Sequence, residues 1–524
     1  MSWSEALPTL LLSAVPLLLA LGAAFSARQT SPTPAWRLAK VSTSGALLLA
    51  IGLLAWALVP GAEAGFWQSA PLNLVMLTLV SFIGFVVVRY SAQYLQGEPR
   101  QTRFAALVQA VFAAVSVAVL SDHLLLFLAA WLGISLAMHQ LLMFYPERPR
   151  AALAAHKKFL FARAAELCAL SAFALLYLHH GTGHISTIVA TYAEPVSLTL
   201  TEQFAASLLA MAALIKCAQL PLHGWLIQVV EAPTPVSATL HGGVINLGGY
   251  LLLMFAPLVL QSAPAQALLL VLAGLSSVLA ALVMMTRISI KVRLAWSTSA
   301  QMGLMLVEIA LGLVELALLH LLAHSCYKAY AFLSSGEAVI QDRQRRLAPA
   351  RTPAIGQWIG AGLCSVLLVA GLLSAGHYGL GLAWPETFSP WVLLALALTT
   401  LMAERDSRLS AGSLLRFAAL AGVLAIVYFG LKTLFGLFFP DYPRATPLWA
   451  DLWMSVLFAA LFTAYALLRH GAHRPAVQRL AVALYAGFYL DEWVTKTTLK
   501  LWPHRLPTRA RPKQLHPISE EGLL

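Results

Sequence analysis

Ionisable side chains interrupt several long apolar runs of this sequence. Lys216 lies in LLAMAALIKCAQLPLHGWL, and Lys328 ends the segment HLLAHSCYK. A charge at the centre of a bilayer costs at least about 2.5–3.5 kcal/mol, so such residues face the protein interior and usually mark ion or proton pathways. We therefore predict that these lysines carry protons or another cation.

Lys216 is expected beside a break in its helix. Pro221 follows five residues later, and a proline removes a backbone donor and clashes with the carbonyl four residues back. Broken helices at membrane depth are tolerated where they line a cavity. Pro233 and Pro235, in EAPTPVSATLH, predict a further interruption before a new helix that carries His241.

Histidines supply groups that titrate near neutral pH. His320, His324 and Lys328 recur at every fourth position, which places them on one stripe of a helix that could relay protons through water. Two histidines four apart could also bind zinc, but no acidic or thiolate third ligand is evident nearby, and the lysine would oppose a cation. We predict no metal site in this chain.

Other charges also fall inside apolar runs. Glu308 lies in QMGLMLVEIALGL and Lys432 in VYFGLKTLFGLFF, and we assign both to the cation pathway. Arg163 and Glu166 are three residues apart, so they can pair on one helix face. A structural ion pair and a moving or gating charge both remain open for these two residues.

The elements that must position these groups are membrane-spanning helices. Of the 524 residues, 60% are hydrophobic and 11% are charged, whereas soluble domains carry about 25% charged residues. This balance excludes an ordinary soluble enzyme, a nucleic-acid-binding protein and a disordered protein. Because long apolar runs recur throughout, the predicted fold class is all-α, a polytopic membrane protein with about fifteen transmembrane helices.

The apolar pattern sets the expected spans. They are residues 6–26, 43–60, 69–90, 104–120, 123–144, 158–179, 205–228, 235–258, 266–286, 294–312, 315–336, 356–378, 388–403, 412–439 and 449–468. We therefore expect a transmembrane domain over residues 1–468 and a tail over residues 469–524.

The basic residues predict the orientation. All but four of the 34 lysines and arginines are assigned to span ends, loops or the tail, Lys157 and Lys158 among them, and the loops on one side and the tail hold nearly all of these. Cytoplasmic loops carry the excess of Lys and Arg, so we expect the N-terminus outside and the C-terminus in the cytoplasm, in the cell inner membrane. The net charge of +12 then implies no nucleic-acid partner.

The tail contains LAVALYAGFYLDEWVTKTTLKLW, which could be an amphipathic interfacial helix or a segment that docks on a partner. A sixteenth span is disfavoured because Asp491, Glu492, Lys496 and Lys500 interrupt the apolar pattern.

Residues of about 120–340 resemble the proton-conducting membrane transporter family, which includes antiporter-like subunits of respiratory complex I and of Mrp-type sodium/proton antiporters. The resemblance rests on KCAQLPLHGWLIQVVEAPTPVSATLHGGVINLGGY, IKVRLAWSTSAQMGLM, HLLAHSCYKAYAFLSSG, DHLLLFLAAWLGISL and the GFYLDEW of the tail. It implies an antiporter-like fold in which Lys216 is the proton-carrying lysine of the broken helix. It also implies a central hydrated axis that contains His241, His320, His324 and Lys328.

The sequence departs from the complex I pattern at the helix that carries the family's glutamate. Complex I subunits have WEG there, and this chain has Trp131, Leu132 and Gly133. That glutamate tunes the broken-helix lysine in the family, so the Glu–Lys coupling is expected to be absent or rewired here. Glu308 is one candidate for a local substitute.

The family core, the missing glutamate and the short basic tail together resemble the membrane subunit of a two-component inorganic-carbon accumulation system. The resemblance implies that the chain passes a cation and is not itself an enzyme. It also implies a partner with a zinc site similar to β-carbonic anhydrases, which hydrates CO2 to bicarbonate, so the cofactor is expected on the partner. The alternative is a subunit of a cation/proton antiporter or of a complex I-like pump.

Overall fold

The computed structural model describes residues 3–57, 70–347, 353–381, 384–385, 387–405, 411–436, 447–471 and 473–501. Within these residues the chain is helical, and the extended pairing is limited to one isolated bridge between His123 and His184. Twelve helical segments are long and apolar enough to cross a membrane. The prediction of an all-α polytopic membrane protein is confirmed.

The expected spans fall on helices in chain order. These are α1 (Trp3–Ala27), α2 (Pro32–Ala57), α3 (Pro71–Tyr94), α4 (Gln101–Leu120), α5 (Leu124–Leu142), α6 (Pro149–His180), α8 (Leu200–Lys216) with α9 (Gly224–Gln228), α10 (Thr234–Gly242) with α11 (Leu247–Met254), α13 (Ala263–Met285), α14 (Ile290–Ala310), α15 (Val314–Leu333), α17 (Ile355–Leu380), α18 (Ser389–Arg405), α19 (Ala411–Gly436) and α20 (Leu448–His470). Because α8, α14 and α18 are not among the twelve segments that are long and apolar enough, the count of fifteen spans stays a prediction.

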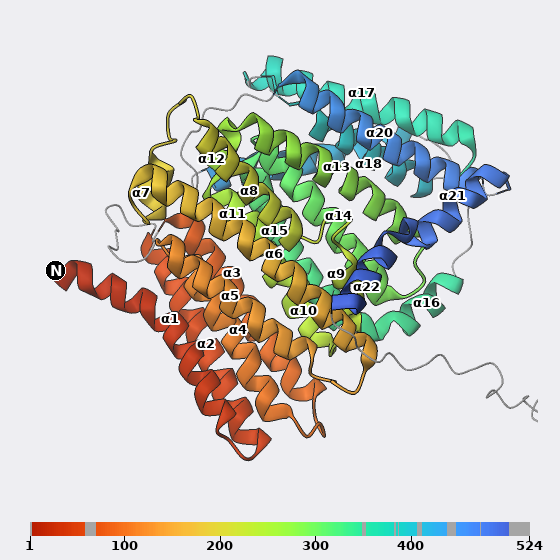
Figure 1. Ribbon diagram of the computed structural model, residues 1–524. Coiled ribbons are helices and arrows are strands. Elements are labelled where there is room, and N and C mark those ends of the chain that lie inside the picture. Colours follow the sequence, from red (N-terminus) through yellow and green to blue (C-terminus); the bar gives the residue numbers. More distant parts are fainter. Residues whose placement is uncertain are drawn as a thin grey trace, which may run out of the picture.

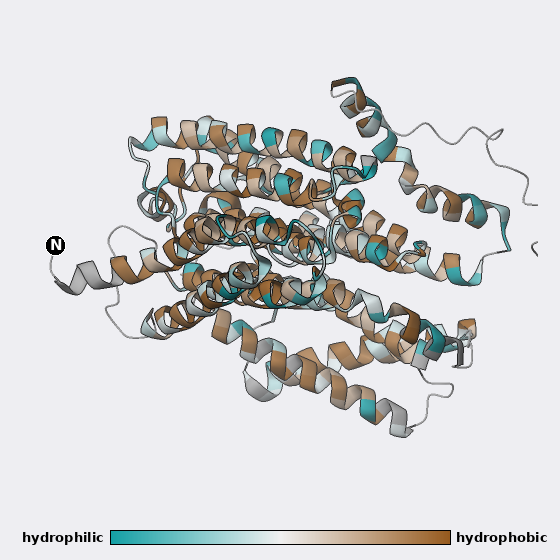
Figure 2. Ribbon diagram, turned by 90° about the horizontal axis from the view of Figure 1, so that it is seen from below, coloured by the Kyte–Doolittle hydropathy of each residue, from teal (hydrophilic) through white to brown (hydrophobic). Residues whose placement is uncertain are grey.

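Short helices connect or flank these elements. They are α7 (Ile185–Ala190), α12 (Ala256–Gln261), α16 (Ala338–Leu347), α21 (Pro475–Tyr485) and α22 (Leu490–Leu501). Figure 1 shows α1 and α2 at one edge of the bundle and α17 to α20 at the opposite edge. In Figure 2, apolar residues predominate along the helices, as a lipid environment requires.

The centre of the bundle is formed by the segment that contains α10 and α11. In the most apolar 18-residue stretch of this segment, 94% is buried inside the protein, whereas the corresponding share in α19 is 6%. Gly242 allows this central position, because a Cβ there would lie 2.9 Å from the carbonyl oxygen of Ser325 in α15. The close approach of α10 and α15 places His241 beside the polar stripe of α15.

The expected break after Lys216 is present. α8 ends at Lys216, Pro221 lies in the irregular segment that follows, and α9 begins at Gly224. Side chains of α13 and α14 satisfy the backbone groups that the break releases: Ser299 Oγ donates to the Ala218 carbonyl over 2.8 Å, and the Leu220 N–H donates to Ser276 Oγ over 2.9 Å. The break is therefore a supported element of the fold, as non-helical backbone at membrane depth must be.

The second interruption differs from the expectation. Pro233 precedes α10 and Pro235 lies in its first turn, but the helix does not continue through the expected span 235–258. Instead α10 ends at Gly242, a 3-10 turn (Val244–Asn246) follows, and α11 begins at Leu247. The correction has a local cause, because the sequence GGVIN offers two adjacent glycines that weaken a helix.

The start of α6 was also misplaced by the sequence pattern. The helix begins at Pro149, nine positions before the expected start at residue 158, because proline is well suited to the first turn. Lys157 and Lys158 consequently lie within the helix, and both are buried. Their assignment to the basic residues outside the spans is wrong.

The tail forms two helices that turn back onto the bundle. Gly487, Phe488 and Tyr489 all have positive φ angles, of 63°, 54° and 57°, and they make the sharp turn between α21 and α22. α22 then contacts α6 and α9, and Figure 1 shows it beside α9. Residues 502–524 of the expected tail lie outside the described residues.

Candidate functional site

The ammonium group of Lys216 lies at the break in α8. The side chain is buried, and its Nζ atom is 4.6 Å from the ring centroid of Trp131 in α5. A cavity of about 20 Å³ opens beside it, lined among others by Lys158, Trp225 and Leu240. A volume of this size holds about one water molecule. The geometry thus gives Lys216 an aromatic face on one side and room for a hydrogen-bonding water.

Glu166 is the carboxylate whose charge reaches Lys216. It lies on α6, where Arg163 Nη2 donates to its Oε1 over 2.8 Å. The structure therefore shows the ion pair that the spacing allows, and it also places this pair beside Lys216. Glu308 does not occupy that place, because its carboxylate contacts His320 instead.

The position of the family's missing glutamate does not face Lys216. Leu132 is 37% exposed on the outer surface of α5, one residue after the buried Trp131. In this chain the carboxylate that acts on the broken-helix lysine is Glu166 of α6. We call Lys158, Arg163, Glu166 and Lys216 the lysine cluster.

Lys158 is the second buried ammonium group of this cluster. Its Nζ atom donates to the Ser135 carbonyl over 2.7 Å and to Ser135 Oγ over 3.1 Å. The charges of Lys158 and Lys216 act on each other. The charge of Glu166 acts on both ammonium groups, and both side chains line the water-sized cavity. A water molecule there can therefore carry a proton between them.

The neighbouring Lys157 faces the tail. Its Nζ atom donates to both oxygens of Asp491 over 2.9 Å and to Thr495 Oγ1 over 2.6 Å. Asp491 also accepts from Gln228 Nε2 in α9 over 2.8 Å. A Cβ at Gly224 would lie 1.5 Å from Asp491 Oδ1, so this contact requires glycine there. The GFYLDEW segment is therefore fixed to the two elements, α6 and α9, that flank the lysine cluster.

A second group of buried ionisable residues lies on α10, α14 and α15. We call it the histidine cluster, and it consists of His241, Glu308, His320, His324 and Lys328. The charge of Lys328 acts on His241 and His324, and His320 also acts on His324. The structure thus brings together the predicted groups of the histidine stripe with His241 and Glu308.

α14 supplies a polar partner to several members of the histidine cluster. Lys328 Nζ donates to Ser297 Oγ over 2.7 Å, and His241 Nδ1 lies 3.0 Å from Thr298 Oγ1. His320 Nδ1 lies 2.9 Å from Glu308 Oε2, and its Nε2 lies 2.9 Å from Gln301 Oε1. Both ring nitrogens of His320 therefore face oxygen acceptors, an arrangement that suits the doubly protonated ring.

Three buried imidazole nitrogens of the histidine cluster have no hydrogen-bond partner among the described residues. They are Nε2 of His241 and both ring nitrogens of His324. Buried polar atoms are nearly always satisfied by protein or by ordered water. These nitrogens therefore favour a hydrated passage between α10 and α15, which the resemblance also implies.

α10 lies between the two clusters. Leu240 and Val244 line the Lys216 cavity, whereas the adjacent His241 packs against the Phe332 ring of α15, with a centroid separation of 4.4 Å. Lys432 belongs to neither cluster, because its side chain is exposed on α19. The predicted pathway residues thus form two buried groups separated by one helix, with Lys432 apart from both.

Comparisons with known proteins identify the family. The probable inorganic carbon transporter subunit DabB of Hydrogenovibrio crunogenus is 48% identical to this chain over 99% of both sequences. The chain belongs to the DabB family of inorganic carbon transporter subunits. The probable inorganic carbon transporter subunit DabB2 of Halothiobacillus neapolitanus is 38% identical, over 88% of this chain and 84% of that protein.

The wider resemblance is confirmed as well. The family described as NADH:quinone oxidoreductase/Mrp antiporter matches residues 121–352, and the complex I chain 5 N-terminus family matches residues 68–105. The solved Mrp complex from Dietzia sp. DQ12-45-1b aligns over 95% of this chain and 61% of that one, with 24% identity and a TM-score of 0.63. This likeness shows that the fold is antiporter-like.

Sequence reasoning missed several members of the site. Lys157 and Lys158 stand next to a basic loop, so their position suggested topology and not burial. Asp491 was assigned to a polar interruption of the tail, although its place in GFYLDEW was a signal that it has a fixed role. Glu166 was recognised as the partner of Arg163, but nothing in the sequence indicates that it lies beside Lys216.

Proposed function

We propose that this chain conducts protons across the cell inner membrane and thereby drives the hydration of CO2 to bicarbonate by a DabA-like zinc partner. The observation that supports this proposal is the pair of buried clusters on α6, α8, α10, α14 and α15. Ionisable groups are costly in a bilayer, so nine of them on adjacent helices, six buried and three partly buried, favour a transfer pathway over a structural role. Membership of the family of inorganic carbon transporter subunits supports a role in inorganic-carbon transport.

In the proposed mechanism, protons from outside load the lysine cluster and pass across α10 to His241. His324 and Lys328 then carry them toward the cytoplasm, and the His320–Glu308 pair exchanges protons with His324 from the outer end of α15. This chain takes no part in bond formation to CO2, and the zinc that serves the hydration reaction is held by the partner. The N-terminus lies outside and the C-terminus in the cytoplasm in this proposal, which C-terminal reporter fusions test.

The function is tested by co-expression with the product of the adjacent gene in a host that lacks carbonic anhydrase. Wild-type protein is expected to co-purify with a zinc-containing partner and to restore growth in air. Lys216→Ala is expected to abolish growth while the two chains still co-purify. Growth of that variant at the wild-type rate would show that the lysine assignment is wrong, and failure of the wild-type pair would overturn the proposal.

Cation/proton antiport is the second candidate, because the fold resembles that of an Mrp complex. Inverted membrane vesicles that contain the chain and its partner distinguish the two functions. A sodium gradient that moves protons without added CO2 or bicarbonate would favour antiport. Proton movement that depends on CO2 or bicarbonate would favour the inorganic-carbon proposal.

A further inference from the structure

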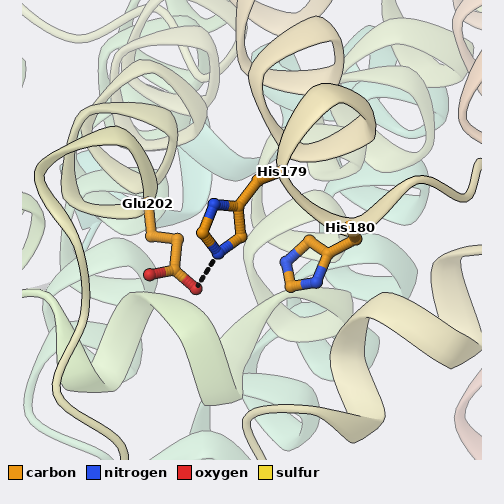
Figure 3. A group of neighbouring side chains, drawn as sticks. All are labelled: His179, His180 and Glu202. Atoms are coloured by element: carbon orange, nitrogen blue, oxygen red, sulfur yellow. Dashed lines mark ion pairs between the residues drawn. The ribbon is translucent and has the colours of Figure 1, made fainter.

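The end of α6 remote from Lys157 carries side chains that the proposed pathway does not use. His179 and His180 are the last two residues of α6, which ends there because Gly181 adopts a left-handed conformation with φ 67°. Glu202 lies in the first turn of α8. Figure 3 shows the two rings next to each other beside the Glu202 carboxylate. One nitrogen or oxygen of each residue lies within 4.8 Å of the others.

The Glu202 carboxylate is held in place by its surroundings. Its Oε2 atom accepts hydrogen bonds from the backbone N–H and the hydroxyl of Thr199, over 2.7 and 2.6 Å. Its Oε1 atom accepts from the Tyr192 hydroxyl over 2.8 Å and lies 3.3 Å from His179 Nε2. Such outer hydrogen bonds orient the carboxylate ligands of metal sites. One oxygen thus anchors the side chain, and the other is directed at the histidines.

The electrostatics of the group favour a cation. Among the described residues, the charges that act on Glu202 and His180 come from within the group itself and not from lysine or arginine. The Tyr192 hydroxyl donates to the carboxylate but contributes no positive charge. The buried carboxylate therefore lacks a permanent positive partner in the described part of the chain.

We propose that His179, His180 and Glu202 bind a divalent transition-metal ion of the zinc class. Two imidazoles and one carboxylate form a known ligand set for Zn²⁺, which leaves a fourth position for water. The His179 side chain is 34% exposed, so it is accessible to an ion from solvent and can rotate to shorten the distances. The bound ion joins the end of α6 to the start of α8, the two helices that carry Glu166 and Lys216. The proposal departs from the expectation, drawn from residue spacing, that the chain holds no metal site.

The test measures the zinc content of the purified complex of this chain with its partner. The complex is treated with a chelator, exposed to Zn²⁺ and desalted, and the zinc content and melting temperature are measured. The wild-type complex is expected to hold one more zinc per chain than the double variant His179→Ala/His180→Ala. Zn²⁺ should also raise the melting temperature of the wild type more than that of the double variant.

Two further variants make the result decisive. His184→Ala changes an exposed histidine at the same end of the bundle and is expected to behave as the wild type. Glu202→Gln keeps an oxygen for the Thr199 contacts but removes the charge, and it should weaken zinc affinity at least about tenfold. Bound Co²⁺ should show visible absorption bands that the double variant lacks. Equal zinc content and equal melting-temperature shifts in the wild type and the double variant would overturn the proposal.

Discussion

Asp491 and Lys157 form an ion pair that joins the tail to the transmembrane bundle. Both carboxylate oxygens lie 2.9 Å from the ammonium nitrogen, whose side chain is fully buried although the two residues are 334 positions apart. The pair lies next to Lys158 and beside α9, so it connects the C-terminal segment to the vicinity of the broken helix. The tail is thus part of the site's support.

Asp491→Asn is expected to destabilise the protein by about 1–3 kcal/mol, because a buried ammonium group loses its charged partner. The 31% exposure of the Asp491 side chain keeps the effect below that of a fully enclosed pair. The melting temperature in detergent measures the loss. The matched control is Glu492→Gln, an exposed neighbour, which should leave the melting temperature unchanged. Restoration of stability by Lys157→Met in the Asp491→Asn background would identify the unpaired charge as the cause.

Gly224→Ala is expected to break the same contact from the other side. The added methyl group would overlap Asp491 Oδ1, so the tail must move away from α9. Growth in air and melting temperature should both fall, whereas Gly336→Ala, with open space around it, should change neither. In the Asp491→Ala background, Gly224→Ala should add little further loss. A full additional loss in that background would mean that the glycine has another role.

Glu166→Gln is expected to lower proton conduction on the order of tenfold or more, since Lys216 loses its nearby carboxylate. Installing the family's glutamate by Leu132→Glu should not restore the activity of Glu166→Gln, because Leu132 lies on the exposed face of α5. Proton uptake into vesicles with a pH-sensitive dye measures both. Recovery in the Leu132→Glu/Glu166→Gln double variant would contradict the placement of the counter-charge on α6.

Glu308→Gln and His320→Gln are expected to impair conduction to a similar degree, again by about tenfold or more, because the two side chains act as one hydrogen-bonded unit. The double variant should be little worse than either single variant. A loss of conduction in the double variant equal to the product of the two single losses would show that the residues act independently. Co-purification with the partner serves as the control for correct assembly of all three variants.

Local sequence signals predicted the chemistry of the site better than its geometry. Pro221 indicated the break that follows Lys216. The four-residue spacing of His320, His324 and Lys328 indicated a stripe, which the structure places on α15. These inferences succeed because a proline or a helical repeat acts within a few residues. The role of Lys432 could not be predicted in this way. Its sequence neighbours are as apolar as those of Lys216, yet its side chain is exposed.

Contacts between distant segments could not be inferred in the same way. Glu166 and Lys216 are brought together by the packing of α6 on α8, and the burial of Lys157 depends on a helix formed by the last part of the chain. A single sequence, taken without an alignment, contains no measure of such pairings. The neighbourhood of His179 and Glu202 is a third case, because a loop and a short helix separate them along the chain.

The long separation of Lys157 and Asp491 has a consequence for biosynthesis. A ribosome completes α6 and all the later spans before it reaches α22, so the ammonium group of Lys157 has no carboxylate partner during most of translation. The region around the broken helix can reach its final packing only when the last segment has been released. A chain shortened before residue 491 therefore keeps an unneutralised charge beside the lysine cluster.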